Sequence, residues 1–318
     1  MVQAEWVLLS TETKKEFSIL VMFLLQMTAH ISLFRSRQHI IQLLNRISGI
    51  FKILHWKCSK KNVIIPMSIY CIAINVIAFS LGAIYYISTL TVLAHQQVKN
   101  STNVDDNFKR YFLITLDIKN VTTAFVLCCL NASFSCYYCF VSYYMSLLFF
   151  EFISKSQGLI AKEDYHSILH VYHELTDTLT YMDDFLSYPV FIHVLGNMAG
   201  LFWSSYAIIF IPTDDYLAYI YLIVACLLYW KWLLMIMLPA SSANKAAKNA
   251  RDIILSLPGW FPQHHRKLKL AVRREFKQTK YALTLWKTYL INRSILISAL
   301  GTLITYGIII ATFGSVKQ

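Results

Sequence analysis

Six long stretches of the chain carry almost no charged residues. They are Phe17–Phe34, Val63–Ala94, Asn120–Phe150, Phe185–Pro212, Tyr216–Pro239 and Ser294–Val316, and only the fifth contains a charge, Lys231. A soluble helix has an apolar stripe and a polar face, but these stretches are apolar around most of their circumference. About 20 apolar residues in a helix cross a bilayer, and in lipid the backbone must bond within its own segment. The pattern therefore predicts an all-α membrane bundle with six spanning helices.

The first stretch is the weakest of the six, because it is short and contains Gln26 and His30. A buried or interfacial helix is the alternative for this stretch.

Two segments between the apolar stretches repeat apolar residues at a spacing of four and three. They are Ile40, Leu44, Ile47, Phe51, Leu54 and Ile168, Tyr172, Leu175, Leu179, Met182. This spacing is typical of packed helices, so we predict that the spans continue beyond the membrane as long helices and pack together. The first stripe also permits a basic helix lying on anionic lipid. The acids around the second stripe, such as Asp183 and Asp184, favour protein packing there.

The composition excludes several classes of protein. Of 318 residues, 57% are hydrophobic and only 14% are charged, against about 25% charged in soluble domains. A typical soluble enzyme and a disordered chain are therefore excluded. No phosphate-binding loop, nucleophile elbow or zinc-protease motif occurs, and Cys136-x-x-Cys139 lacks a second pair at metal-site spacing. We expect no catalytic residue, no metal and no cofactor.

The net charge of +12 could suggest nucleic acid, but its location argues for a membrane protein instead. Residues 35–61 hold seven Lys or Arg and no acid, and residues 245–287 hold eleven with two acids. The positive-inside rule places both loops in the cytoplasm. The loop 95–119 then lies outside, and it carries the sequon Asn100-Ser101-Thr102, so we expect Asn100 to be glycosylated. Both chain ends would also lie outside.

The last apolar stretch contains a motif that resembles the signature of the insect gustatory receptors. The family pattern is Thr-Tyr, five hydrophobic residues and Gln-Phe, and residues 305–313 read Thr-Tyr-Gly-Ile-Ile-Ile-Ala-Thr-Phe, with Thr312 in place of Gln. Lys287 stands where many members have Gly. Members of this family have seven helices with the amino end inside. Aligned from its carboxyl end, this chain would lack the first helix, which accounts for the amino end that the charges place outside.

The resemblance implies a ligand-gated, non-selective cation channel in the plasma membrane, assembled as a homo- or hetero-tetramer of related receptors. The last helix would line the pore, with pore and gate residues Thr305, Tyr306, Ile309, Thr312 and Phe313. A small-molecule tastant would bind among the outer ends of the other helices, which carry Tyr85, Tyr86, Trp203, Tyr206, Phe210 and Tyr219. The same aromatic residues could equally be membrane-interface residues without a ligand. Sugar-sensing members have Glu after Thr-Tyr, so Gly307 favours a bitter or orphan receptor.

The expected organisation has four parts: a tail (1–16), a five-span ligand-binding bundle (17–239), a basic cytoplasmic segment (240–293) and a pore helix with a short tail (294–318). An odorant receptor of the same superfamily is the first alternative, although the Thr-Tyr…Phe motif disfavours it. A transporter would need an internal repeat or ion-binding acids in the spans, and neither is found. A G-protein-coupled receptor would place the basic loops on the opposite faces.

Overall fold

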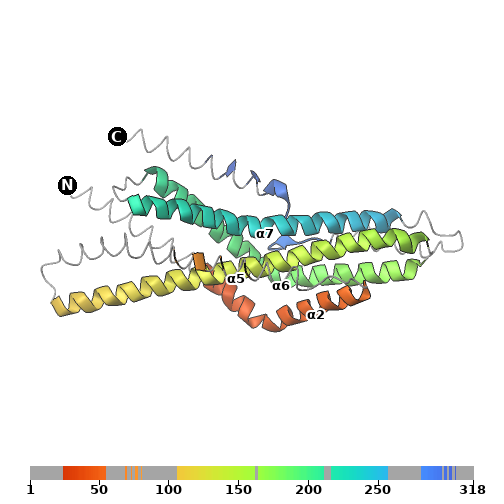
Figure 1. Ribbon diagram of the computed structural model, residues 1–318, viewed down its shortest axis with the longest axis horizontal. Helices are drawn as coiled ribbons and strands as arrows, with labels where there is room; N and C mark the ends of the chain where they lie inside the picture. The colour runs from red at the N-terminus through yellow and green to blue at the C-terminus, as the bar shows by residue number, and fades with distance from the viewer. Residues whose placement is uncertain are drawn as a thin grey trace. The chain divides into compact units, whose positions relative to one another are not determined.

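The computed structural model describes residues 24–54, 106–161, 164–210, 216–256 and 281–295, together with ten further residues between 69 and 80 and between 297 and 305. Helices dominate the described residues. They are α2 (Arg37–Ile53), α5 (Asp106–Ala161), α6 (Tyr165–Phe210) and α7 (Tyr216–Ser256), and residues 24–35 are also helical (Figure 1). The strands β1 (Thr284–Leu285) and β2 (Tyr289–Leu290) form one short antiparallel sheet. The predicted helical bundle is therefore confirmed, with a hairpin that the sequence pattern did not predict.

The three long helices greatly exceed the thickness of a bilayer. α5 has 56 residues, α6 has 46 and α7 has 41. At about 1.5 Å per residue, even α7 is roughly 60 Å long, against a hydrocarbon core of about 30 Å. Among the described residues, three helical segments are long and apolar enough to cross a membrane: Cys129–Ile160, Tyr165–Ile209 and Leu222–Ser256. They correspond to the third, fourth and fifth predicted spans. Residues 24–34 of the first predicted span are also described and helical, whereas most of the second and sixth spans lies outside the described residues.

Two prolines lie inside these helices rather than at their ends. α6 contains Pro189, and α7 passes through Pro239 and continues to Ser256. A proline lacks the N–H that would bond to the carbonyl four residues earlier, so each helix loses one backbone hydrogen bond at that point. The beginning of the expected basic cytoplasmic segment is thus a direct continuation of the fifth predicted span.

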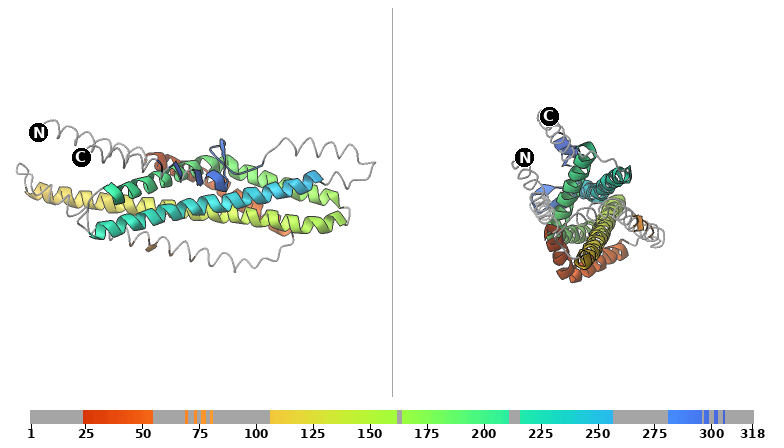
Figure 2. Two further views of the ribbon diagram at one scale, coloured as in Figure 1. Left: turned by 90° about the horizontal axis from the view of Figure 1, so that it is seen from above. Right: turned by 90° about the vertical axis from the view of Figure 1, so that its left-hand side faces the viewer.

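The chain divides into two compact units. Unit 1 comprises Met1–Trp56, Tyr144–Gly196 and Ser241–Ile291, and unit 2 comprises Lys57–Tyr143, Asn197–Ala240 and Asn292–Gln318. In unit 1, α2, α5, α6 and α7 lie side by side (Figures 1 and 2). Phe152 of α5 contacts Tyr172 of α6, with ring centroids 5.9 Å apart, and the Ser146 and Ser242 hydroxyls join α5 to α7 at 3.0 Å.

The stripe on α6 forms the centre of unit 1. All five of its predicted residues are buried: Ile168, Tyr172, Leu175, Leu179 and Met182. These side chains pack within the chain, so they offer no surface to another subunit. α7 contributes small residues to the same unit, Ala243, Ala246, Ala247 and Ala250, which are all buried. Small side chains allow close approach of neighbouring helices.

The predicted stripe on α2 is right in part: Ile47 and Leu54 are buried, Ile40 and Phe51 are half-buried, and Leu44 is exposed. Leu43, Ile47, Ile50 and Leu54 are buried, whereas the predicted Leu44 is 40% exposed. The cause is a second four-three repeat that shares Ile47 and Leu54 with the predicted one, so the spacing alone did not select the face. α2 is held against α6 through Tyr181, whose hydroxyl donates to Gln42 Oε1 at 2.6 Å. The Arg46 guanidinium lies 4.6 Å from the centroid of the same ring.

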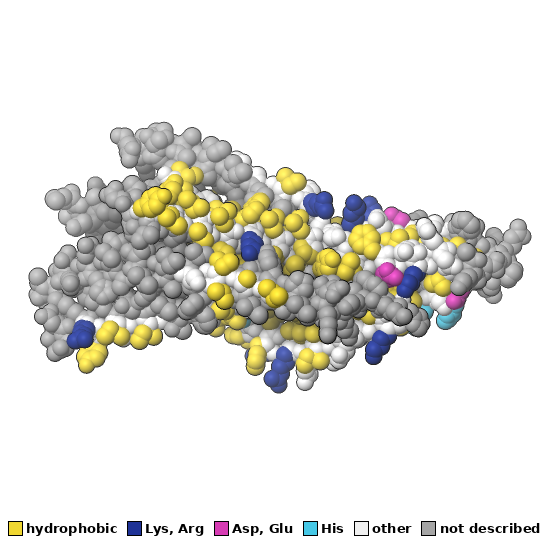
Figure 3. Space-filling view, in the orientation of Figure 1, with side chains coloured by type: hydrophobic (Ala, Val, Ile, Leu, Met, Phe, Trp, Pro, Cys, Tyr) yellow, Lys and Arg dark blue, Asp and Glu magenta, His cyan; other side chains and the backbone are white. Residues whose placement is uncertain are grey.

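Unit 2 contains the most apolar parts of the long helices. Ala132 and Cys136 of α5 pack with Trp232 and Met235 of α7 in a buried cluster. Gly200 of α6 lies so close to the Tyr229 ring that an added Cβ would be 2.5 Å from it, so a larger residue would displace this ring. On the face drawn in Figure 3, hydrophobic side chains gather over the part of α7 that belongs to unit 2. Exposed Ile220, Ile223 and Leu227 are typical of a lipid-facing surface.

Candidate functional site

The described residues that lead into the last apolar stretch form a β-hairpin. Thr284 pairs with Leu290 and Leu285 with Tyr289. The Thr288 N–H donates to the Leu285 carbonyl at 3.0 Å and closes the turn. Both central residues are non-glycine residues with positive φ, 48° at Trp286 and 54° at Lys287. This left-handed conformation costs an L-residue about 1–2 kcal/mol, so other contacts must hold the turn in place.

Asn244 of α7 holds the two residues that flank the strands of the hairpin. Its Nδ2 donates to the Leu283 carbonyl at 3.0 Å and to the Ile291 carbonyl at 2.8 Å, and its Oδ1 accepts from the Leu283 N–H at 2.7 Å. The Ile291 N–H also donates to the Leu283 carbonyl at 3.1 Å. An amide has two donor hydrogens and one acceptor oxygen. In Asn244 both hydrogens and the oxygen bond to the backbone of Leu283 and Ile291.

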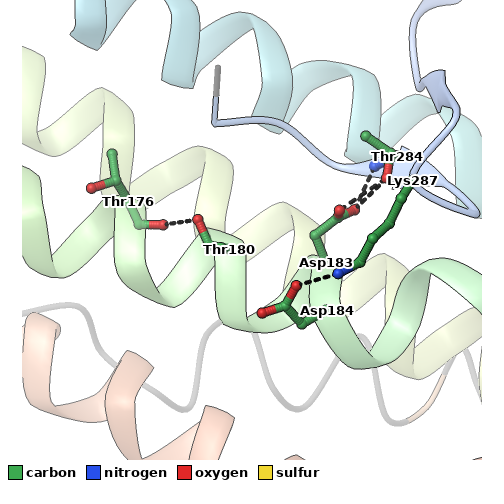
Figure 4. Close-up of polar contacts among 6 residues, drawn as sticks. All are labelled: Thr176, Thr180, Asp183, Asp184, Thr284 and Lys287. Carbon is green, nitrogen blue, oxygen red and sulfur yellow. Dashed lines mark hydrogen bonds and ion pairs between the residues drawn. The ribbon is translucent and has the colours of Figure 1, made fainter. Parts of the chain in front are cut away.

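Two adjacent acids of α6 bind the other side of the hairpin (Figure 4). Asp183 Oδ1 accepts from the Thr284 N–H at 2.6 Å, and the Thr284 hydroxyl lies 3.0 and 2.9 Å from the two carboxylate oxygens. Lys287 Nζ lies 2.7 Å from Asp184 Oδ1. The hydrogen bond and the charge of Asp184 raise the pKa of the Lys287 ammonium. The side chains of this ion pair are more than half exposed, so the pair adds little stability.

Trp286 docks on the next turn of α6. The backbone N–H of Trp286 donates to the Ser187 carbonyl at 3.2 Å. Its ring contacts Tyr188 and Phe191, with centroids 6.1 and 5.1 Å away. Aromatic pairs at this separation are stabilising. Asp183, Asp184, Ser187, Tyr188 and Phe191 together form the acceptor surface of the hairpin on α6.

The chain passes directly from this hairpin into the helix of the last apolar stretch. Asn292 Oδ1 accepts from the Ile295 N–H at 2.8 Å, which is the geometry of a helix N-cap. Further along, Thr305 is exposed, and its hydroxyl donates to the Gly301 carbonyl at 2.8 Å. This bond lies within the helix turn, so the Thr305 hydroxyl is already satisfied. The other predicted pore residues, Tyr306, Ile309, Thr312 and Phe313, lie outside the described residues, as does Asn100.

The predicted ligand-binding residues are only partly described. Trp203 and Tyr206 lie on one face of α6 with ring centroids 6.0 Å apart. Trp203 and Tyr219 are each 41% exposed. These exposures fit a membrane interface as well as a ligand site, so the assignment of these residues stays a prediction. Tyr85, Tyr86 and the Phe210 side chain lie outside the description.

Sequence reasoning missed the residues that anchor the last helix. Asp183 and Asp184 were recognised only as acids that favour protein packing, and Asn244 and Trp286 were not singled out. One signal was present: Asn244 is a large polar residue in an otherwise small-residue segment, Ala240-Ser241-Ser242-Ala243-Asn244. Its partners are about 40 residues away in the sequence, so no local periodicity links them.

Comparisons with known proteins agree with this architecture. The sequence model of a family described as "Trehalose receptor" matches residues 107–318. The structure of the insect olfactory receptor OR5 from Machilis hrabei has a similar fold, with a TM-score of 0.55 and 13% identity over 91% of this chain and 78% of that one. The same receptor in complex with eugenol gives a TM-score of 0.56 and 13% identity over 92% of this chain and 79% of that one. No curated protein matches the chain.

Proposed function

The chain belongs to the trehalose receptor family of insect gustatory receptors, and we propose that it is a taste receptor that opens a non-selective cation channel when a small molecule binds. The chain is thus a multi-pass helical membrane receptor of the insect chemoreceptor superfamily and not an enzyme. The observation that carries the proposal is the family match over residues 107–318, which includes the hairpin and the last apolar stretch.

The proposed channel is a tetramer in the plasma membrane with the last helix of each subunit around a central pore. The apolar sequence near Phe313 supports a constriction that closes by excluding water. The anchoring of the preceding hairpin supports a defined starting point for this helix, because the chain enters it directly from Ile291 and Asn292. Thr312 and Phe313 are the proposed gate residues, with Thr305 and Ile309 on the pore side.

For the ligand we propose a small, partly apolar molecule that binds near Trp203 and Tyr206. Two aromatic rings on one face of α6 support this site, since ligand pockets are mostly apolar with a few polar groups. Gly307 stands where sugar-sensing members have Glu, which supports a bitter or orphan receptor. The name of the family model instead suggests trehalose as the competing ligand.

Whole-cell recording tests this function directly. Cells expressing the chain, alone or with related receptors, are exposed to trehalose, eugenol and a panel of bitter compounds, with surface expression measured in parallel. We expect a cation current that reverses near 0 mV, the signature of a non-selective pore. A chain that reaches the surface and carries no current with any partner or ligand would contradict the proposal. A response to trehalose alone would retain the channel and reject the ligand class.

A further inference from the structure

We propose that the Trp286–Lys287 turn is a gating latch docked on α6, and that Asp183, Asn244 and Trp286 are positioning residues for the last helix. The proposal rests on the proposed channel function. It assigns the control of gating to a site outside the pore and outside the predicted ligand-binding residues.

The first step is covalent continuity. The hairpin ends at Ile291, whose carbonyl accepts from Asn244, and the next residue, Asn292, caps the following helix. No flexible linker separates the anchored strand from that helix. Any displacement of the hairpin therefore displaces the first turn of the last helix.

The second step is the strain in the turn. Trp286 and Lys287 both have positive φ, and a bulky residue in this region is an outlier that needs external support. The support comes from α6, through the Ser187 carbonyl, the rings of Tyr188 and Phe191 and the Asp184 carboxylate. In the proposed latch, the docked turn is one state, and a turn that has lost these partners and relaxed is the other.

The third step is the acceptor surface itself. The residues of α6 that hold the turn lie between Asp183 and Phe191, and Pro189 lies among them. Because Pro189 has no N–H, the Phe185 carbonyl lacks its usual helical partner, and the helix bends more easily at this point. α6 also carries Trp203 and Tyr206, two of the predicted ligand-binding residues. A ligand that changes the bend of α6 would change its fit to the turn.

The key experiment strengthens and weakens the latch separately. Lys287→Gly removes the strain at position 287 and leaves that at Trp286, because glycine adopts positive φ freely, but it also removes the ion pair with Asp184. Lys287→Ala removes the same ion pair and keeps the strain, so it is the matched control. Asp183→Asn and Trp286→Ala weaken docking and leave the turn strained. Asp177→Asn is the control for the acid substitution, since Asp177 lies on the same helix and pairs with His173 rather than with the hairpin.

Two readouts are taken for every variant. The first is the current without ligand and during application of trehalose or eugenol, normalised to surface expression and accompanied by the reversal potential. The second is hydrogen–deuterium exchange of the peptide 281–291 in purified receptor. We expect faster exchange in Asp183→Asn and Trp286→Ala, and slower exchange in Lys287→Gly than in Lys287→Ala.

The gating result has an expected sign pattern. Relative to the parent, Asp183→Asn and Trp286→Ala should both change the ligand-free current in the same direction, by about threefold or more. Relative to Lys287→Ala, Lys287→Gly should change it in the opposite direction by a similar factor. The reversal potential should stay unchanged, because the pore lining is intact, and Asp177→Asn should behave as the parent. A merely structural role would lower all currents together.

The outcomes separate the latch from the channel. If the parent conducts and the variants change exchange without changing gating, or shift gating in one common direction, the latch is overturned and the channel function stands. If the parent reaches the surface and never conducts, the channel function fails and the latch fails with it. If Asp183→Asn does not reach the surface, the Lys287→Gly and Lys287→Ala pair decides alone, because Lys287 is exposed and its replacement leaves the core intact.

Discussion

At the scale of single residues, Asn244 is expected to contribute most to the stability of the hairpin. Asn244→Ala removes three hydrogen bonds and leaves polar groups of Leu283 and Ile291 without this partner. Each unsatisfied buried group costs about 1–3 kcal/mol, so thermal unfolding of the purified receptor in detergent should occur several degrees lower. Asn45→Ala on the exposed side of α2 is the matched control and should leave the unfolding temperature unchanged. Equal unfolding temperatures for both variants would contradict this role.

The proposed gate residues make a second prediction at this scale. Phe313→Ala removes most of an apolar side chain from the proposed constriction, and a wider pore is wetted more easily. We therefore expect a larger ligand-free current at equal surface expression. Thr312→Gln introduces the residue of the family pattern and should change ion permeation, measured as the relative permeability to Na⁺, K⁺ and Ca²⁺. If both variants reach the surface and conduct as the parent does, the last helix does not line the pore.

At the scale of elements, the two helical stripes show what the sequence could and could not specify. The α6 stripe was predicted correctly because its apolar residues follow a single four-three repeat. On α2 two repeats overlap. Whether Leu43 or Leu44 is buried depends on where the partner helix lies, and the sequence pattern of α2 does not contain this information. The hairpin could not be predicted, because strands of two residues have no recognisable alternation. It exists through contacts with α6 and α7 that are distant in sequence.

The α2 and α6 registers can be tested with one substitution type. Leu175 is fully buried, whereas Leu44 is 40% exposed. Leu175→Ala should lower the free energy of unfolding by about 2–5 kcal/mol, and Leu44→Ala should change it by less than about 0.5 kcal/mol. Detergent thermal-shift assays give the comparison. A larger effect at Leu44 would restore the stripe first predicted for α2. Native gels of Leu44→Ala would also measure the fraction of tetramer. If this variant is folded but forms less tetramer, the exposed face of α2 lies at a subunit interface.

At the scale of the whole molecule, the membrane class and the long helices could be predicted from the sequence because they depend only on local apolar length. The third and fifth predicted spans lie within α5 and α7, and α6 contains the fourth as far as Phe210; all three helices begin before or continue after the predicted spans. The ligand-binding and pore residues could not be derived in this way. An aromatic residue such as Trp203 is as typical of a membrane interface as of a ligand pocket, so its presence in the sequence does not distinguish the two. The proposed role of Phe313 follows from the family pattern.

The orientation of the chain in the membrane is the last prediction. Residues 245–287 carry eleven Lys or Arg and two acids, so translocating this segment against the positive-inside rule would be costly. We therefore expect it on the cytoplasmic side and Asn100 on the opposite side, where its sequon can be glycosylated. In microsomes, Asn100→Gln should abolish a glycosidase-sensitive mass shift, and Asn131→Gln, in a sequon within α5, should leave it unchanged. A protease added outside sealed microsomes should cleave the 257–280 segment. If this segment is protected until detergent is added, the topology is the reverse of the one predicted. The hairpin, and the proposed gating latch with it, would then lie on the outer side of the membrane.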